Sequence, residues 1–471
     1  MFGVWIEEGP SDWQILQQKN GFAELIVSGQ FTVLRIGLDI GAPRAIPRIR
    51  VMNEQDHYAV VPWTDCEFEY TKDRYAGCWS ARLRLPTGGL YRVETGLFTY
   101  WENPRFPFKE FRGDVRLHLG AGDLFMIAGQ SNAAGCARDS AYDAPDLRVH
   151  LYRNRRKWDL ACHPMNESTD AAGGEANTEN GNSGTCPYLS FAKRYSDAAG
   201  YPVGLIMTAA GGSPMKRWDP DQKADLYRAM LSKIRDCGGE AAAVLWYQGC
   251  SDTDTMEQAL HYEESFIRMV RELRKDLGTE IPFFTFQLNR YANGELDCAW
   301  GIVRDVQRRM TKLLPAVKVL PTVQCGMSDG IHNSAGANVH LGEILARQCA
   351  AVLLGRGEFE APDLKRIVRM TEHSCRVEFE HVQGEFVLAG EGALPYGFSA
   401  EDEQGRIMIT RLYAQGGALI VEMDRTPGEQ GRLSFCAQAD PHRWLPKDGV
   451  TYMPPLAFYQ VKIGSEPEEQ E

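Results

Sequence analysis

The stretch that decides the fold is Leu124-Phe125-Met126-Ile127-Ala128-Gly129-Gln130-Ser131-Asn132-Ala133-Ala134-Gly135. A short apolar run ends in glycine, presents a serine, and continues into small residues that suit the start of a helix. This order is typical of a buried strand followed by a tight turn. In an open α/β sheet such a turn presents the serine at the carboxyl edge, where ligands bind. Ser131 is a nucleophile only if a histidine and an acid activate it.

Around this stretch, from residue 119 to 355, apolar runs alternate with amphipathic stretches. The apolar runs are 124–128, 203–210, 242–247, 282–288 and 317–323. The amphipathic stretches are 188–198, 226–234, 256–277, 302–314 and 341–354. This alternation predicts an α/β domain, with a parallel sheet covered by helices on both faces. One insertion, 164–187, is rich in Asn, Gly, Ser and Glu, and a loop of that length is either disordered or functional.

The flanking regions have β character. Residues 79–86 and 90–95 flank the turn signal Thr87-Gly88-Gly89 and predict a hairpin within a sandwich-like domain. After residue 356 alternating runs return, and the last residues, 465–471, are acidic. A chain of 471 residues is too long for one ordinary core. We therefore expect three domains: a β-rich accessory domain over 1–118, a catalytic α/β domain over 119–355, and a C-terminal β-rich domain over 356–471.

Composition excludes several classes of function. The net charge of -12 argues against nucleic acid or an anionic membrane as a partner, because both require basic surface. No apolar run approaches membrane-spanning length, and no signal peptide is visible, so a cytoplasmic protein is expected. The 12 cysteines lack C-x-x-C spacing, the histidines lack metal-ligand spacing, and the P-loop pattern is missing. We expect neither a metal nor a cofactor, and the oligomeric state stays open.

The best partners for Ser131 are Asp329 and His332, which stand three residues apart. They follow the apolar run 317–323 and precede a predicted helix. This spacing lets one loop hold the imidazole, with Asp329 orienting His332 and stabilising the imidazolium that forms when the serine proton is taken. The alternative is a pair of ordinary loop or capping residues. The position after a strand, opposite a strand-end serine, favours the catalytic reading.

Acyl transfer also requires hydrogen-bond donors aimed at the developing oxyanion. Three candidates follow three predicted strands: the N–H of Ser131 itself, the turn Gly211-Gly212, and the side chain of Gln248. Bare glycine lets a ligand approach the backbone closely. These glycines are also consistent with a purely structural role in tight strand-to-helix turns.

Four motifs together resemble the sialate O-acetylesterase-type members of the SGNH (GDSL-like) hydrolases: Gly129-Gln130-Ser131-Asn132-Ala133, Gly211-Gly212, Trp246-Tyr247-Gln248-Gly249 and Asp329-Gly330-Ile331-His332. The resemblance implies a flavodoxin-like three-layer α/β/α fold and a metal-free esterase that removes acetyl groups from carbohydrates. It implies Ser131 as nucleophile, His332 as base and Asp329 as orienter. The oxyanion hole implied consists of the Ser131 N–H, a Gly211 or Gly212 N–H, and Gln248. Cys250 stands where many relatives have glutamate, so any role of that acid does not transfer.

Residues near these strand ends are candidates for binding the sugar. Aromatic faces suit sugar rings, and a guanidinium pairs with the carboxylate of a sialic acid. The candidates are Gln130, Asn132, Arg217, Trp218, Trp246 and Arg290. For the tryptophans core packing is the alternative, and for the arginines a solvated surface position. O-acetylated sialic acids are the expected substrates. The alternatives are acetylxylan or another acetylated sugar, or a carbohydrate-binding protein without turnover.

Overall fold

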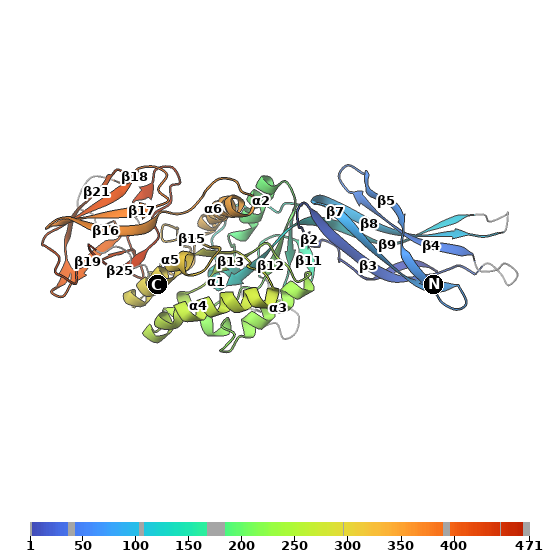
Figure 1. Ribbon diagram of the computed structural model, residues 1–471, viewed down its shortest axis with the longest axis horizontal. Coiled ribbons are helices and arrows are strands. Elements are labelled where there is room, and N and C mark those ends of the chain that lie inside the picture. Colours follow the sequence, from blue (N-terminus) through green and yellow to red (C-terminus); the bar gives the residue numbers. More distant parts are fainter. Residues whose placement is uncertain are drawn as a thin grey trace.

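The computed structural model describes residues 2–35, 43–102, 108–166, 184–294, 296–389, 396–442 and 444–464. The molecule is elongated, and two β regions lie at opposite ends of a central α/β domain (Figure 1). Most of the insertion at 164–187, and the acidic tail at 465–471, fall outside the described residues.

Seven strands of an 11-stranded sheet form the central layer, in the order β11-β10-β12-β9-β13-β14-β15. Their bounds are β9 Lys109–Gly129, β10 Val149–Tyr152, β11 Trp158–Leu160, β12 Val203–Met207, β13 Ala243–Tyr247, β14 Phe283–Phe286 and β15 Val317–Leu320. Neighbours from β10 to β15 are parallel, and β11 pairs antiparallel with β10 at the edge. All five apolar runs are strands, so the predicted parallel sheet is confirmed.

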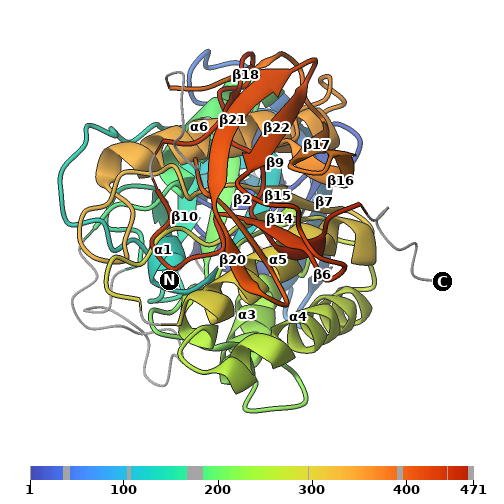
Figure 2. The same cartoon turned by 90° about the vertical axis from the view of Figure 1, so that its left-hand side faces the viewer.

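Helices cover both faces of this sheet (Figure 2). They are α1 Ser131–Ala134, α2 Tyr188–Ala199, α3 Asp225–Asp236, α4 Met256–Leu277, α5 Asp297–Leu313 and α6 Ala335–Leu353, with short 3₁₀ turns η1 Met215–Arg217 and η2 Cys250–Asp252. Because successive side chains of a strand point to opposite faces of the sheet, β9 contributes side chains to two hydrophobic cores. Leu124 and Met126 pack with residues of α3, α4 and α5, whereas Phe125 and Ile127 pack with residues of α2 and α6. The predicted three-layer domain is confirmed.

Strand β9 is 21 residues long and belongs to two regions at once. Its first part pairs antiparallel with β8 of the N-terminal region, and its second part runs parallel to β12 and β13. Residue 118, where we expected the domain boundary, lies inside this strand. The serine turn therefore ends a strand that is held from both domains.

The N-terminal region is built from two sheets over a shared apolar core. Its strands are β1 Gly3–Glu8, β2 Ile15–Gln17, β3 Phe22–Thr32, β4 Arg44–Asn53, β5 Ala59–Asp65, β6 Glu67–Tyr70, β7 Ala76–Pro86 and β8 Gly88–Tyr100. The predicted hairpin of β7 with β8 is wrong, because β7 pairs with β3 and β6 while β8 pairs with β4 and β9. Gly88 and Gly89, at φ +136° and +140°, carry the chain from one sheet to the other.

The C-terminal region is also β-rich, as expected. Its strands are β16 Asp363–Thr371, β17 Ser374–Glu380, β18 Phe386–Val387, β19 Phe398–Asp402, β20 Gly405–Ile407, β21 Ile409–Gln415, β22 Ala418–Met423, β23 Arg432–Phe435, β24 Lys447–Asp448 and β25 Phe458–Lys462. They form two four-stranded sheets, β16-β17-β22-β21 and β20-β19-β23-β25, with β18 paired to β24. Within the residues described, no helix has the length and apolar character needed to cross a membrane.

Candidate active site

Ser131 lies at the turn where β9 passes into α1, at the carboxyl edge of the sheet. Gly129 makes this turn with φ +129°, and a Cβ added there would lie 2.2 Å from the carbonyl oxygen of Tyr247. A side chain at this position would therefore collide with the backbone of β13. The Gln130 N–H then donates to the same Tyr247 oxygen at 2.9 Å, which fixes the turn that presents Ser131.

Asp329 and His332 lie in one tight loop, residues 328–333, which we call the histidine loop. The Asp329 Oδ2 atom lies 2.7 Å from His332 Nδ1, while Oδ1 accepts the main-chain N–H groups of Ile331 at 2.9 Å and His332 at 2.8 Å. Burial alone raises the pKa of Asp329, but the hydrogen bonds from the His332 ring and these two N–H groups outweigh it and lower that pKa. The carboxylate thus stays ionised and holds the imidazole by Nδ1, and Nε2 takes no part in this contact.

Asn132 joins the serine turn to the histidine loop. Its Oδ1 accepts the Asn333 N–H at 3.0 Å, and its Nδ2 donates to the Ile331 carbonyl at 3.4 Å. Asn132 and Asn333 are 201 residues apart in sequence and are the immediate neighbours of Ser131 and His332. The fold therefore brings the predicted nucleophile and the predicted base to one place.

The Gly211-Gly212 turn lies against the same edge. It follows β12, and the Ala210 N–H donates to the Gly129 carbonyl at 2.9 Å, which docks this turn beside the serine turn. Gly212 has φ +59°, and a Cβ built on it would meet no atom within 4 Å. The space beside the Gly212 Cα is thus empty, so no protein atom blocks a ligand that approaches this point of the turn.

Gln248 is a correction to the predicted oxyanion hole. Its side chain is completely buried, and its Nε2 donates to the Ser213 carbonyl at 2.9 Å and to Asp252 Oδ2 at 2.5 Å. A primary amide has two N–H donors, and both are used. Gln248 therefore ties the 211–213 turn to the end of β13 and has no N–H left for an oxyanion.

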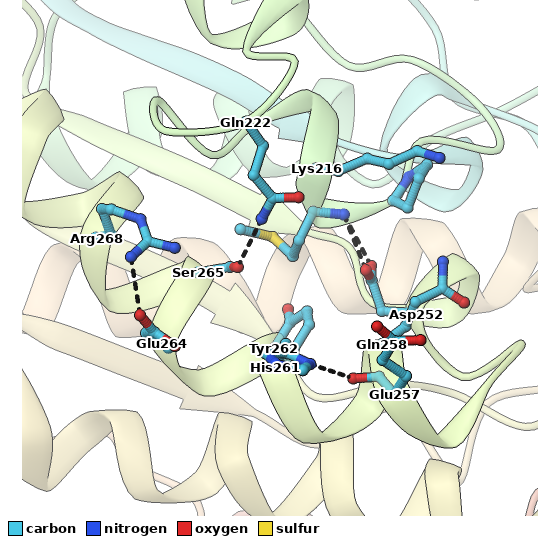
Figure 3. A pocket seen from close by; sticks show the side chains of 12 residues that line it. Lys216, Gln222, Asp252, Glu257, Gln258, His261, Tyr262, Glu264, Ser265 and Arg268 are labelled. Atoms are coloured by element: carbon cyan, nitrogen blue, oxygen red, sulfur yellow. Dashed lines mark hydrogen bonds and ion pairs between the residues drawn. The ribbon is translucent and has the colours of Figure 1, made fainter.

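Asp252 holds neighbouring segments of the site in place, and the sequence analysis did not single it out. Both its carboxylate oxygens accept the Met215 N–H, at 2.9 and 3.1 Å, and one also accepts from Gln248. It lines a pocket of about 290 Å³ between η1 and α4, together with Gln222 and Arg268 (Figure 3). Burial raises the pKa of Asp252 to about 7. Its place three residues after the Gln-Gly pair that follows β13 was the available signal.

The six predicted sugar-binding residues are a second correction, because none presents a free side chain. Trp218 and Trp246 are 0% and 1% exposed and pack edge to face in the core. Arg217 forms an ion pair with Asp225, and Arg290 is buried against Asp440. The remaining two, Gln130 and Asn132, are buried and bind main-chain groups of neighbouring loops.

An arginine that the sequence reasoning missed lies beside the histidine loop instead. The Arg138 side chain is 80% exposed, and its Nε lies 4.0 Å from Asp329 Oδ2. Its backbone is held on both sides: Ala137 forms a bridge with Thr185, and Asp139 accepts the Ala335 N–H at the start of α6. A guanidinium is thus presented to solvent next to the predicted triad. Its only sequence signal is its closeness to Ser131.

Comparison with known proteins agrees with this architecture. Residues 121–351 match the family model described as carbohydrate esterase, sialic acid-specific acetylesterase. A probable carbohydrate esterase from Arabidopsis thaliana is 29% identical over 262 residues, covering 50% of this chain and 94% of that protein. The crystal structure of a carbohydrate acetylesterase from Xanthomonas citri superposes with a TM-score of 0.63 at 19% identity, covering 95% of this chain and 97% of the other, so the fold of nearly the whole chain is shared. By these matches the chain is a carbohydrate esterase, and its residues 121–351 match the sialic acid-specific acetylesterase family.

Proposed function

We propose that this esterase removes O-acetyl groups from carbohydrates through a Ser131–His332–Asp329 triad, with O-acetylated sialic acids as its substrates. The single observation that carries the triad is the docking of the histidine loop on Asn132, the residue after Ser131. With Asp329 bound to Nδ1, the His332 ring offers Nε2 as the proton acceptor.

The reaction follows from these positions. Ser131 Oγ attacks the ester carbonyl carbon while its proton passes to His332 Nε2, and the carbonyl oxygen becomes an oxyanion. The N–H groups of Ser131 and of the Gly211-Gly212 turn stabilise that oxyanion. His332 then protonates the departing sugar oxygen, leaving an acetyl group on Ser131. Water, deprotonated by His332, attacks this acyl-enzyme and releases acetate and free Ser131.

Two observations support an acidic sugar as the substrate. The family model that matches residues 121–351 is described as specific for sialic acid. Arg138 presents a guanidinium beside Asp329, and guanidinium groups bind carboxylates through charge-assisted hydrogen bonds. A neutral sugar such as acetylated xylose offers no carboxylate to this arginine.

Acetate release from a matched panel of O-acetylated sialic acids and acetylated xylan fragments tests the substrate. We expect a preference for the sialic acids of at least about tenfold in kcat/KM, the value of one charge-assisted contact. Equal or greater turnover of the xylan fragments would refute the assignment. Ser131→Ala tests the nucleophile and should lose nearly all turnover on every acetyl ester, because the triad acts as a unit. A Ser131→Ala protein that hydrolyses aryl acetates at the parent rate would exclude the triad.

A further inference from the structure

The short segment 289–292, which follows β14, lies between the C-terminal β domain and the histidine loop. On one side the Tyr291 N–H donates to the Ala439 carbonyl at 2.9 Å. On the other side the Ala292 N–H donates to the Gly330 carbonyl at 2.8 Å. Two successive peptide groups therefore bind the C-terminal domain and the histidine loop. The segment therefore links the C-terminal domain to the histidine loop through neighbouring residues of one short stretch.

Buried side chains of the same segment reinforce both contacts. Asn289 is fully buried, and its Nδ2 donates to the Ile331 carbonyl at 2.6 Å, next to the predicted base. Arg290 is 4% exposed, and its Nη1 donates to Asp440 Oδ1 at 2.8 Å, while Nη2 donates to the Cys325 carbonyl at 3.3 Å. A buried guanidinium needs such partners, because an unpaired buried charge is strongly destabilising.

Arg304 of α5 fixes the C-terminal segment 436–440 against the end of β14. Its guanidinium is fully buried and donates to the carbonyls of Leu288 at 3.0 Å, Cys436 at 2.8 Å and Ala439 at 3.3 Å. Burial lowers the pKa of Arg304 to about 10. The segment 436–440 is therefore held by a satisfied buried cation.

We propose that the C-terminal β domain positions the general base: its segment 436–440 holds the histidine loop through residues 289–292, with the Arg290–Asp440 ion pair as the positioning contact. This inference rests on the proposed function, because it takes His332 as the base. Removing the Asp440 charge leaves buried Arg290 without its anionic partner, so residues 289–292 shift and the histidine loop shifts with them. Misplacing a catalytic group by about 1 Å costs up to about a hundredfold in rate.

Asp440 is a suitable probe because its side chain is 43% exposed, so a replacement side chain fits without rearranging the core. Asp440→Ala and Asp440→Asn should lower kcat on an aryl acetate about tenfold or more, with KM changed less than about twofold, because His332 acts on the Ser131 proton and not on substrate binding. Asp440→Glu, which keeps the charge, should recover most of kcat.

Asp402→Asn is the matched control. Asp402 forms a two-point ion pair with Arg425, at 2.5 and 2.7 Å, and its hydrogen-bond partners among the described residues all lie in the C-terminal domain. This variant should lower the melting temperature at least as much as Asp440→Asn and leave kcat unchanged. The proposal is overturned if kcat of Asp440→Ala stays within twofold of the parent, or if Asp402→Asn loses kcat equally. His332→Ala distinguishes failure of this inference from failure of the proposed triad. If the His332→Ala variant retains activity, the triad itself is wrong.

Discussion

Asp329→Asn is the sharpest test of the triad, because the geometry dictates how the new amide must sit. Asp329 Oδ1 accepts two main-chain N–H groups, at 2.9 and 2.8 Å, and only an oxygen can accept them. The Asn oxygen therefore stays at that position, and its NH₂ group faces His332 Nδ1, where Oδ2 stood at 2.7 Å. The ring must then accept at Nδ1 and carry its proton on Nε2. An imidazole in that tautomer cannot take the Ser131 proton.

The expected loss is large and specific to catalysis. The corresponding exchange in serine proteases lowers kcat about 10⁴-fold, which is about 5 kcal/mol of transition-state stabilisation. The two hydrogen bonds to the loop backbone survive, so the free energy of unfolding should fall by only about 1 kcal/mol. Steady-state hydrolysis of an aryl acetate, with urea unfolding of the same preparation, measures both.

Asp329→Ala provides the contrast to this variant. It removes the acceptor of both backbone N–H groups as well as the ring contact, so the histidine loop loses its internal bonds and stability falls by about 1–3 kcal/mol. If Asp329→Asn retained turnover within tenfold of the parent, the role of Asp329 as orienter of His332 would be refuted. Loss of folding in Asp329→Asn would refute the amide placement itself.

Two further variants test the role of Arg138 in substrate preference and the role of Asp252 in stability. Arg138→Ala should lower kcat/KM about tenfold on acetylated sialic acids and leave neutral aryl acetates unaffected, since only the former carry a carboxylate; an equal loss on both would refute a specificity role. Asp252→Asn should change how the free energy of unfolding depends on pH. Because the pKa of Asp252 in the folded protein is raised to about 7, the parent loses stability as pH rises from about 4 to about 7. The loss is about 1.4 kcal/mol per pH unit. The variant has no such pH dependence. Between about pH 4.5 and pH 6.5, urea unfolding should therefore show that the parent loses up to about 3 kcal/mol more of its unfolding free energy than the variant does. An equal change in both proteins would contradict a buried, protonated Asp252 carboxyl.

The layers of the fold were predictable from periodicity because hydrophobic burial repeats along the chain. The residues 124–128 and 243–247 are buried on both faces and form continuous apolar segments, as parallel strands do. The pairing of β7 and β8 was not predictable in the same way. Turn residues at 87–89 are compatible with a hairpin and with a crossing between two sheets, and only the partners, β3 and β4, decide which one forms.

The full length of β9 was not predictable from the sequence, for a related reason. Its first part, up to about residue 117, alternates between half-buried and exposed positions, whereas its last part is buried throughout. One strand therefore carries two hydrophobic patterns, because it runs from a part of the sheet with one solvated face into a part that is covered on both faces. A change of pattern indicates a change of environment, and in this chain the strand continues through it.

At the site, local contacts were predictable and long-range contacts were not. The Asp329–His332 bond spans three residues, so spacing alone suggested it. Gln248 was assigned the wrong role because its partners, Ser213 and Asp252, become visible only when three segments meet. The same holds for Arg290, whose partner Asp440 lies 150 residues away.

These errors share one physical cause, which also explains how the site is built. Amide side chains that follow strand ends are candidate ligand groups by type, yet Gln130, Asn132, Gln248 and Asn289 are all at most 3% exposed and bind the backbone of neighbouring loops. A buried polar group left unpaired costs about 1–3 kcal/mol, so these partners are obligatory. The amides therefore lock the loops together, and reaction chemistry is left to groups that remain accessible. Of the side chains discussed, Ser131, His332 and Arg138 remain accessible, and these are the groups to which the proposed function assigns catalysis and recognition of the substrate.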